Sequence, residues 1–272
     1  MEERRVPLSQ PEGNTSLRLD RKVAVITGGG SGIGRAIALK FAAHGAAVRV
    51  LDLKVADAEE TCQQITAADG NAAANACDVT DQKQVKDTFA EIAAQGPLSI
   101  LVNNAGISHI GTVESTTEED FDRVFRVNVK GFYNCMRAAI PPMKANGGGV
   151  ILNLASIAGS VGLADRFAYS MSKGAVIAMT YSVARDYLGS KIRCNCISPA
   201  RVHTPFVDNY LRKTYPGREA EMFEKLSKTQ PIGRMAEPGE VASLALFLCS
   251  EEASFITGVD YPIDGGFFNL HG

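Results

Sequence analysis

A glycine-rich turn near the N-terminus lies between a short apolar run and a helical pattern, and it constrains the fold more than any other feature. Lys22 to Thr27 reads as a strand, Gly28, Ser31, Gly32, Ile33 and Gly34 belong to the turn, and an amphipathic pattern follows to about His44. Glycines permit a tight turn and let backbone N–H groups approach a pyrophosphate, beside the positive end of a helix dipole. A glycine run alone could be an ordinary loop, but this position predicts a βαβ unit that binds a dinucleotide.

The alternation of β-rich runs with amphipathic segments continues from Arg21 to the C-terminus. Such alternation is typical of βαβ units and a parallel sheet. Because the runs are apolar on both faces, we expect helices on both sides of the sheet. The sequence therefore predicts one α/β domain over residues 21–272 with a doubly wound, seven-stranded parallel sheet. The expected strands are residues 22–27, 47–52, 71–78, 98–103, 149–156, 191–198 and 259–264.

Residues 204–232 break this alternation with several prolines, tyrosines and a glycine between Pro205 and Pro231. Ligands of open α/β sheets bind at the carboxyl ends of the strands. We therefore expect this stretch to form a small helical substrate lid over that edge of the sheet.

The first 20 residues are polar and include Pro7, Pro11 and Gly13, so we expect a flexible extension over residues 1–20. They contain no apolar stretch typical of a secretory signal. No later run approaches the ~20 apolar residues that a membrane helix needs. These features predict a cytoplasmic protein with no membrane partner.

Charge and cysteine content exclude further classes. The 28 basic and 30 acidic residues give a net charge of -2, so nothing favours binding to nucleic acid. The six cysteines are scattered through apolar segments, which favours free thiols in a reducing compartment over a disulfide framework. Cys194 and Cys196 would share one face of a strand, but a zinc site needs about four ligands, so we expect no metal.

Asp52 ends the second expected strand, about 20 residues after the glycine-rich turn. A carboxylate at this position can accept hydrogen bonds from the adenosine ribose and would repel the extra phosphate of NADP. We therefore expect NAD as the cofactor. A cap on the following helix is the plainer alternative for Asp52, and the neighbouring Arg49 and Lys54 leave some use of NADP open.

A tyrosine and a lysine four residues apart open a long helical segment that runs to about Leu188. Tyr169 and Lys173 would lie on one helix face, and an ammonium beside a phenol should lower the tyrosine pKa toward working pH. Ser156 closes the fifth strand, where its hydroxyl could hold a substrate oxygen beside the phenol. Asn103 to Gly106 end the fourth strand, and Asn128 lies in a helix that faces the same crevice.

These motifs together make the chain resemble the short-chain dehydrogenase/reductase family from Leu19 to Phe268. The family's T-G-x-x-x-G-x-G turn matches Thr27 to Gly34, and its N-N-A-G element matches Asn103 to Gly106. Its Asn-Ser-Tyr-Lys catalytic set matches Asn128, Ser156, Tyr169 and Lys173 in order. The resemblance implies a Rossmann fold and direct hydride transfer between a secondary alcohol or ketone and the nicotinamide.

The resemblance also implies roles for single residues. Tyr169 would take the alcohol proton, Ser156 would orient the substrate oxygen, Lys173 would bind the nicotinamide ribose and lower the tyrosine pKa, and Asn128 would hold a water in a proton relay. Family members commonly form homotetramers through their long helices and C-terminal strand, where two adjacent aromatics of the tail, Phe267 and Phe268, could pack across an interface. Further cofactor contacts would come from Asp78 and Val79 at the adenine, from Asn104, Ala105 and Gly106, and from Pro199, Val202 and Thr204.

One departure from the family pattern lies after the sixth strand, where Ala200 replaces the usual glycine. A methyl group is tolerated where φ is negative. The exchange therefore leaves cofactor binding in place and puts only the path of this loop in question.

Arg166, Arg201 and His203 lie near the inferred pocket in sequence, with His109 as a further polar candidate. An arginine fork binds a carboxylate through two hydrogen bonds, which favours a small hydroxylated acid as substrate. Each of these side chains could instead point to solvent or pair with a carboxylate of the chain.

The segment from Pro199 to Val241 resembles the family's sugar and sugar-acid dehydrogenases, such as those for L-fucose and 2-keto-3-deoxy-L-fuconate. A 3-oxoacyl-carrier-protein reductase or another carbonyl reductase of the family is the competing enzyme. A nucleotide-sensing protein without chemistry is the alternative from another class. Such proteins typically lose the tyrosine or the lysine, and this chain keeps both.

Overall fold

The computed structural model describes residues 17–270 and confirms the doubly wound α/β fold. The seven expected strands form one parallel sheet in the order β3-β2-β1-β4-β5-β6-β7. The third strand ends two residues before the predicted Asp78, at Ala76. The strands are β1 Val23–Thr27, β2 Ala47–Asp52, β3 Asn71–Ala76, β4 Leu98–Asn103, β5 Gly149–Leu154, β6 Ile192–Pro199 and β7 Asp260–Ile263.

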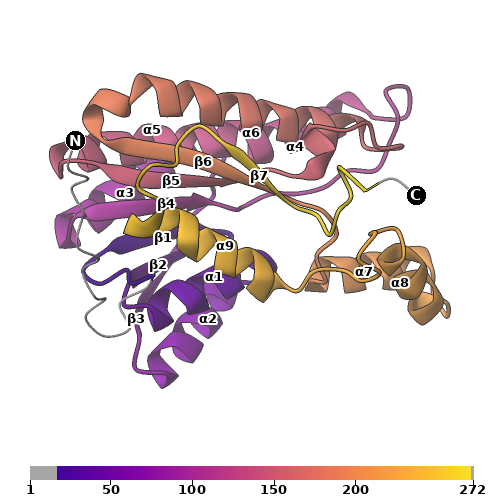
Figure 1. Cartoon of the computed structure of the whole chain (residues 1–272), viewed down its shortest axis with the longest axis horizontal. Coiled ribbons are helices and arrows are strands. Elements are labelled where there is room, and N and C mark those ends of the chain that lie inside the picture. The colour runs from indigo at the N-terminus through magenta and orange to yellow at the C-terminus, as the bar shows by residue number, and fades with distance from the viewer. Residues whose placement is uncertain (1–16, 271–272) are drawn as a thin grey trace, which may run out of the picture.

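Helices cover both faces of this sheet, as the apolar strands predict. Figure 1 shows α1, α2 and α9 on one face and α3 to α6 on the other. In the part of the chain that the structure describes, no helix is both long and apolar enough to cross a membrane. The helices are α1 Gly32–Ala43, α2 Val55–Ala67, α3 Gln82–Gln95, α4 Glu118–Phe125, α5 Gly131–Ala145, α6 Phe167–Asp186, α7 Pro205–Thr214, α8 Glu219–Ser227 and α9 Pro238–Cys249.

Each face of the sheet has its own hydrophobic core. Phe41 of α1 and Leu246 of α9 pack on one face, and Phe89 of α3 and Phe132 of α5 pack on the other, all at most 1% exposed. Burial of a side chain of this size stabilises the fold by roughly 2 kcal/mol. Two packed layers hold the strand ends rigidly, so a site at the sheet's edge has a fixed frame.

The packed domain begins earlier than the sequence predicts. Leu19 is fully buried in the core around α1, and its N–H donates to the carbonyl of His44 at 2.8 Å. The boundary expected at residue 20 is therefore too late. The rest of the expected extension, residues 1–16, lies outside the described residues.

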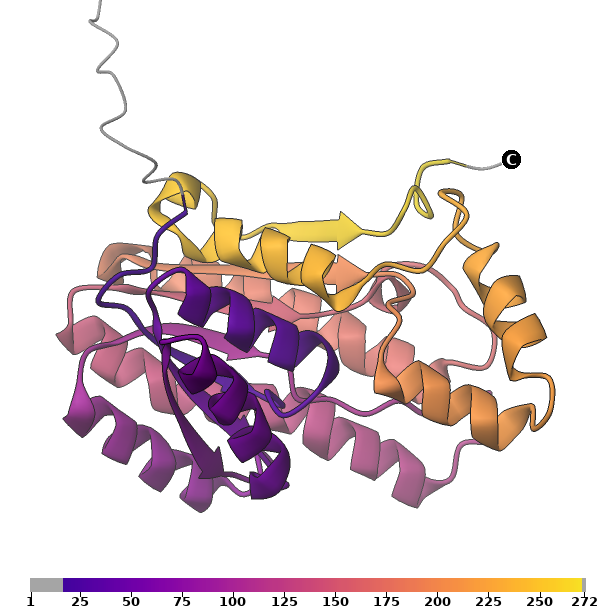
Figure 2. The ribbon, with the colours of Figure 1, turned by 90° about the horizontal axis from the view of Figure 1, so that it is seen from below.

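The stretch expected to be a helical insertion forms α7 and α8, at the end of the sheet where β7 points (Figure 2). Pro205 opens α7 at a position where its missing N–H costs nothing. The two ends of the insertion are joined, because Ala236 N–H donates to Arg201 at 2.9 Å and His203 N–H donates to Ala236 at 2.8 Å. The insertion is therefore a closed loop rooted beside the carboxyl end of β6.

Candidate active site

A cavity of about 610 Å³ lies at the carboxyl edge of the sheet, where the strand order reverses between β1 and β4. Most of the site residues expected from the sequence line it, whereas Gly34, Asn128 and His203 do not. The expected residues along the cavity are Gly28, Ser31, Gly32, Ile33, Asp52, Asp78, Val79, Asn104, Ala105, Gly106, Ser156, Arg166, Tyr169, Lys173, Pro199, Arg201, Val202 and Thr204.

The glycine-rich turn needs its glycines for close backbone approach. Gly28 has a φ of 62°, which favours glycine. A Cβ on Gly34 would lie 2.2 Å from the carbonyl oxygen of Gly28. Gly34 therefore packs against the backbone of the turn and does not line the cavity. The Thr27 hydroxyl accepts hydrogen bonds from the N–H groups of Asn104 and Ala105 at 3.0 and 3.1 Å. The ends of β1 and β4 are thereby fixed to each other.

Asp52 lies at the cavity with its carboxylate held by the backbone. Its Oδ2 accepts the N–H of Gly30 at 3.0 Å, and its Oδ1 accepts the N–H of Lys54 at 3.1 Å. The second bond ends on Lys54, the residue before α2, and not on an N–H of the helix's first turn, so Asp52 does not cap α2 as the plainer alternative predicts. Its carboxylate lines the cavity instead. Neither Arg49 nor Lys54 lines the cavity, and Arg49 reaches Gln95 instead, at 3.4 Å.

Tyr169 and Lys173 meet in the cavity from the first turns of α6. The Lys173 ammonium lies 5.8 Å from the centre of the Tyr169 ring and donates to the carbonyl of Leu154 at 2.6 Å. Burial lowers the pKa of Lys173 from its ordinary value to about 8. A buried ammonium with one carbonyl partner keeps further hydrogens to donate, as a ligand hydroxyl would require.

The expected direction of the Tyr169 pKa is wrong. Burial of the phenol raises its pKa above the ordinary value, because the charged phenolate loses solvation. A hydrogen bond from Ser156 and the positive charge of Arg166 act in the opposite direction. The cation that favours the phenolate here is thus Arg166, whereas Lys173 donates a hydrogen bond to the Leu154 carbonyl.

Asn128 lies one step behind the cavity, in a π-helical turn, Arg126–Lys130, between α4 and α5. It is fully buried: its Oδ1 accepts the N–H of Ile107 at 2.8 Å, and its Nδ2 donates to the Ile107 carbonyl at 2.8 Å and to Ser172 at 3.0 Å. A Cβ on Gly106 would lie 3.3 Å from this Oδ1 and 3.7 Å from the Lys173 ammonium. Gly106 therefore separates the two groups that the proton relay would join.

Ser156 follows β5 and presents a weakly engaged hydroxyl to the cavity. Its Oγ accepts the N–H of Ala158 at 3.2 Å, and its one hydrogen can go either to the Tyr169 phenol or to the Pro199 carbonyl, which lies a long 3.5 Å away. The hydroxyl can exchange the long bond for a shorter one to a substrate oxygen. The loop after β6 keeps its place despite Ala200, whose φ is not positive and whose N–H donates to Ile263 at 3.1 Å.

Two arginines face the substrate end of the cavity. Burial lowers the pKa of Arg201, and the nearby charge of Arg166 lowers it further. The Nε of Arg201 donates to the hydroxyl of Thr229 at 3.1 Å. Within residues 17–270 neither guanidinium has a carboxylate oxygen within 4.0 Å of a nitrogen. Two neighbouring cations without an ion-pair partner can bind an anion.

The two histidines proposed as substrate contacts lie elsewhere. His203 pairs with Asp208 at 2.9 Å and packs edge-on against Phe223, with ring centres 4.9 Å apart. His109 faces Asp120 at 3.7 Å, and neither histidine lines the cavity. Both side chains have carboxylate partners on nearby helices. Their closeness to the motifs along the sequence could not show these partners.

Apolar walls of the substrate end were missed by the sequence analysis. They come from the loop before α6, the lid and the C-terminal tail, namely Leu163, Phe206, Met235 and Phe267. The paired aromatics of the tail were the available signal: Phe267 lines the cavity, and the subunit contact expected of Phe267 and Phe268 stays a prediction. Among residues 17–270 no three His, Cys, Asp or Glu side chains gather as a metal site would require.

Comparisons with known proteins match this geometry. A family model described as enoyl-(acyl carrier protein) reductase matches residues 28–268. The 2-keto-3-deoxy-L-fuconate dehydrogenase of Xanthomonas campestris pv. campestris is 36% identical over 253 residues, which cover 93% of this chain and 82% of that protein. Cyclohexanol dehydrogenase of an Acinetobacter species is 38% identical over 257 residues, with 93% and 97% covered. Dehydrogenase/reductase SDR family member 6 of Xenopus laevis is 38% identical over 250 residues, with 92% and 98% covered.

Solved structures agree over the same length. Levodione reductase superposes with a TM-score of 0.88 at 32% identity, covering 92% of this chain and 98% of that one. The L-sorbose reductase of Gluconobacter frateurii, solved with NADPH and L-sorbose, gives a TM-score of 0.89 at 30% identity, with 94% and 99% covered. These proteins share the fold and differ in the alcohols and ketones that their names give.

Proposed function

Because the chain belongs to the short-chain dehydrogenase/reductase family of oxidoreductases acting on hydroxyl groups, we propose that it interconverts a secondary alcohol and its ketone with NAD as cofactor. The observation that carries this proposal is a single cavity lined by the glycine-rich turn, Asp52, Ser156, Tyr169 and Lys173. This arrangement supports placing a reacting carbon between the acid/base group and the dinucleotide.

The chain's own residues handle the proton. The nicotinamide ring, when bound, accepts or supplies the hydride. Tyr169 takes the proton of the alcohol during oxidation and returns it during reduction, as a general acid/base does. Ser156 holds the substrate oxygen beside the phenol. Lys173 binds the ribose next to the ring with hydrogens not used by Leu154, and Asn128 supports the relay to solvent behind Gly106.

NAD is the proposed cofactor because the carboxylate of Asp52 stands where the adenosine ribose would bind. Its two backbone hydrogen bonds leave further lone pairs for ribose hydroxyls. A phosphate on that ribose would meet a negative charge and, among the residues lining the cavity, no cation near Asp52. The L-sorbose reductase with NADPH shows that relatives of this fold also take the phosphorylated cofactor.

We propose a small hydroxylated acid, such as a sugar acid of the 2-keto-3-deoxy-L-fuconate class, as substrate. Arg166 and Arg201 would bind its carboxylate while Ser156 and Tyr169 hold the reacting oxygen. An anion between the two guanidinium groups would relieve their mutual repulsion and their lost solvation. The name of the Xanthomonas relative supports this class of substrate.

A turnover panel tests the proposal. Purified enzyme is assayed with NAD and NADP against sugar acids, hydroxy acids, neutral sugars, cyclohexanol and 3-hydroxyacyl thioesters. We expect turnover with NAD and a hydroxylated acid, and a loss of at least 100-fold in Tyr169→Phe. Highest turnover with NADP and the thioesters would identify an acyl-carrier-protein reductase instead. Dinucleotide binding without turnover of any alcohol or ketone would identify a sensor without chemistry.

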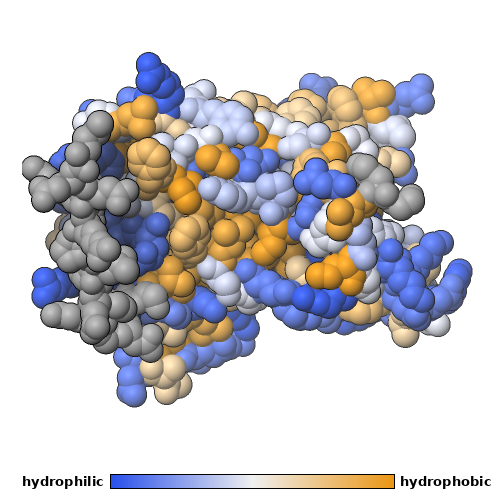
Figure 3. Space-filling view, in the orientation of Figure 1, coloured by the Kyte–Doolittle hydropathy of each residue, from blue (hydrophilic) through white to orange (hydrophobic). Residues whose placement is uncertain are grey.

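We further propose a cytoplasmic homotetramer. The six cysteines are free thiols, which supports a reducing compartment. Figure 3 shows apolar side chains gathered on the face where α9 and β7 lie. Phe255 and Val259, between these two elements, are both exposed. Light scattering coupled to size exclusion would give four subunits, and Phe255→Arg should shift the assembly to smaller species. A monomeric wild type would contradict the proposal.

A further inference from the structure

Every carbonyl of the glycine-rich turn from residue 27 to 30 accepts a hydrogen bond from a side chain of another element. The amide of Asn104 donates to the first two carbonyls, at 3.1 and 3.0 Å. The hydroxyl of Thr61 donates to the third at 3.1 Å, and the guanidinium of Arg35 donates to the fourth through Nε at 2.9 Å and Nη2 at 2.5 Å. The asparagine belongs to the motif after β4, but Thr61 and Arg35 belong to no motif.

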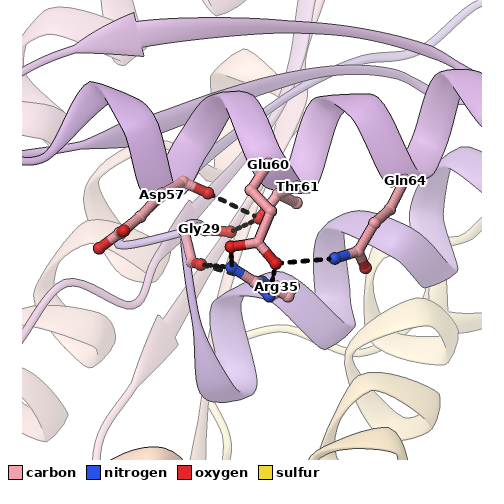
Figure 4. Close-up of polar contacts among 7 residues, drawn as sticks. Gly29, Arg35, Asp57, Glu60, Thr61 and Gln64 are labelled. Atoms are coloured by element: carbon pink, nitrogen blue, oxygen red, sulfur yellow. Dashed lines mark hydrogen bonds and ion pairs between the residues drawn. The ribbon is translucent and has the colours of Figure 1, made fainter.

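Arg35 is itself held in place by α2. Its Nη1 and Nη2 each donate to one carboxylate oxygen of Glu60 at 2.9 Å, and the amide of Gln64 donates to the same carboxylate at 3.3 Å. Figure 4 shows the guanidinium of Arg35 between α1 and α2, pointing at Glu60. A two-pronged pair of this kind fixes direction as well as distance.

The direction of these carbonyls determines where the N–H groups of the turn point. In a trans peptide the C=O and N–H of one unit point in opposite directions. The bond from Thr61 to Gly29 thus turns the N–H of Gly30 the other way, where it donates to Asp52 at 3.0 Å. The bonds from Arg35 to the Gly30 carbonyl likewise turn the N–H of Ser31 away from Arg35, and Ser31 lines the cavity.

We propose that Arg35, fixed by Glu60, and Thr61 are positioning residues for dinucleotide recognition. They set the two peptide units that orient the Asp52 carboxylate and direct one N–H at the pyrophosphate. This inference rests on the proposed dinucleotide-dependent function. On this inference, residues that do not face the cavity control the affinity for the cofactor and the choice between NAD and NADP.

Gly30 packs closely against α2 and against the side chain of Asp52. A Cβ on Gly30 would lie 2.7 Å from the Cβ of Asp57 and 2.8 Å from Oδ2 of Asp52. Thr61 is fully buried, and its one hydroxyl hydrogen is shared between two acceptors, the carbonyls of Gly29 at 3.1 Å and of Asp57 at 3.2 Å. The turn therefore lies directly against α2. A shift of either the turn or α2 would change the position of the Asp52 carboxylate.

The test compares Arg35→Met, Arg35→Lys and Thr61→Val with wild type. Calorimetric titration gives the Kd for NADH and NADPH, and kinetics give KM for NAD separately from kcat. We expect Arg35→Met to raise the Kd for NADH about tenfold, equal to about 1.4 kcal/mol. We also expect it to reduce the ratio by which the protein binds NADH more tightly than NADPH. The effect falls on KM and not on kcat, and Arg35→Lys recovers part of it.

A second ion pair provides the matched control. Arg218 contacts both oxygens of Glu221 at 2.9 and 2.7 Å, on the lid and away from the turn. Arg218→Met should leave the Kd for NADH within twofold of wild type. If Arg35→Met lowers the melting temperature while leaving the Kd for NADH unchanged, Arg35 is structural only and the inference is overturned.

Two further outcomes keep the inference separate from the proposed function. Should Arg35→Met fail to fold, Glu60→Gln, which keeps Arg35 itself, is expected to weaken NADH binding about threefold, and an unchanged Kd overturns the inference. Should wild type prefer NADPH, the proposed NAD preference fails. The Arg35 variants then still decide whether this residue sets the affinity for the dinucleotide that binds.

Discussion

The two ends of the cavity differ in whether their polar and charged groups have partners within the chain. At the dinucleotide end the polar groups are satisfied within the chain, since side chains hold the carbonyls of residues 27–30 and the backbone holds Asp52. At the substrate end Arg166 and Arg201 face each other's charge without a carboxylate partner in the described residues. One end is rigid before its ligand arrives, whereas the other needs an anion to be electrostatically complete.

This difference follows from what each ligand offers. A dinucleotide presents the same pyrophosphate and ribose in every turnover, so a preorganised turn loses little entropy on binding it. An acidic substrate brings a negative charge to two partly buried cations, so discrimination comes from the cost of leaving those cations unpaired. Variants of the two ends should therefore fail in different ways: cofactor variants in affinity, substrate variants in specificity.

The largest expected effect lies where the two ends meet, at Lys173. Lys173→Met removes the ammonium that would bind the nicotinamide ribose while keeping most of the side chain's volume. We expect kcat/KM to fall at least 1000-fold in a steady-state assay with NAD and the best alcohol, since binding and proton transfer are both impaired. A fall of less than tenfold would separate Lys173 from the chemistry.

The same variant should be more stable than wild type. Burial lowers the pKa of Lys173 to about 8, so the folded state holds its proton less tightly than the unfolded chain does. The resulting cost, roughly 3 kcal/mol, is present in full below pH 8 and disappears as pH rises toward the ordinary pKa of about 10.5. Thermal melts of Lys173→Met against wild type should show the gain at pH 7 and its loss near pH 10.5.

Removing a substrate-end cation should come next in size. We expect Arg166→Gln to lower kcat/KM for a hydroxylated acid roughly 30- to 100-fold and to change neutral alcohols much less, because one guanidinium of the anion site is lost. The charge of Arg166 also favours the Tyr169 phenolate, so its loss raises the Tyr169 pKa further. The rise of oxidation rate with pH should then move to higher pH.

A lid arginine outside the cavity serves as control for this prediction. Arg212 lies on α7 and donates to Asn209 at 3.2 Å. Arg212→Gln should leave acids and neutral alcohols unaffected. If Arg212→Gln lowers kcat/KM for the acid as much as Arg166→Gln does, general charge attraction explains the effect and no specific anion site exists.

The predictability of the two ends also differs, for a physical reason. The strands, the glycine-rich turn and Asp52 could be read from the sequence because they act through backbone geometry at fixed spacing from strand ends. The direction of the Tyr169 pKa could not, since it depends on how deeply the whole pocket buries the phenol. His203 was misplaced because its neighbour Phe223 comes from a distant segment of the lid, and the cavity contact of Phe267 was missed for the same reason.

A smaller effect is expected at the dinucleotide end, where Asp52 is one of many residues that line the cofactor's part of the cavity. Asp52→Asn removes the charge that would repel a ribose phosphate, and its amide can accept only one of the two N–H bonds now made. We expect kcat/KM to fall about tenfold with NAD and to rise about tenfold with NADP. Glu59→Gln, an exposed change on α2, is the control for net charge. An unchanged ratio would remove Asp52 from cofactor selection.

The smallest effect is expected at His203, which joins the root of the lid to both of its helices. Its contacts with Asp208 and Phe223 are partly exposed, and such contacts contribute about 1 kcal/mol together. His203→Ala should therefore raise KM for the acid only about threefold and speed tryptic cleavage within residues 205–233. His44→Ala removes a ring that hydrogen-bonds the Lys40 carbonyl on α1 and should change neither. A loss as large as that of Arg166→Gln would restore His203 as a substrate contact beside the two arginines.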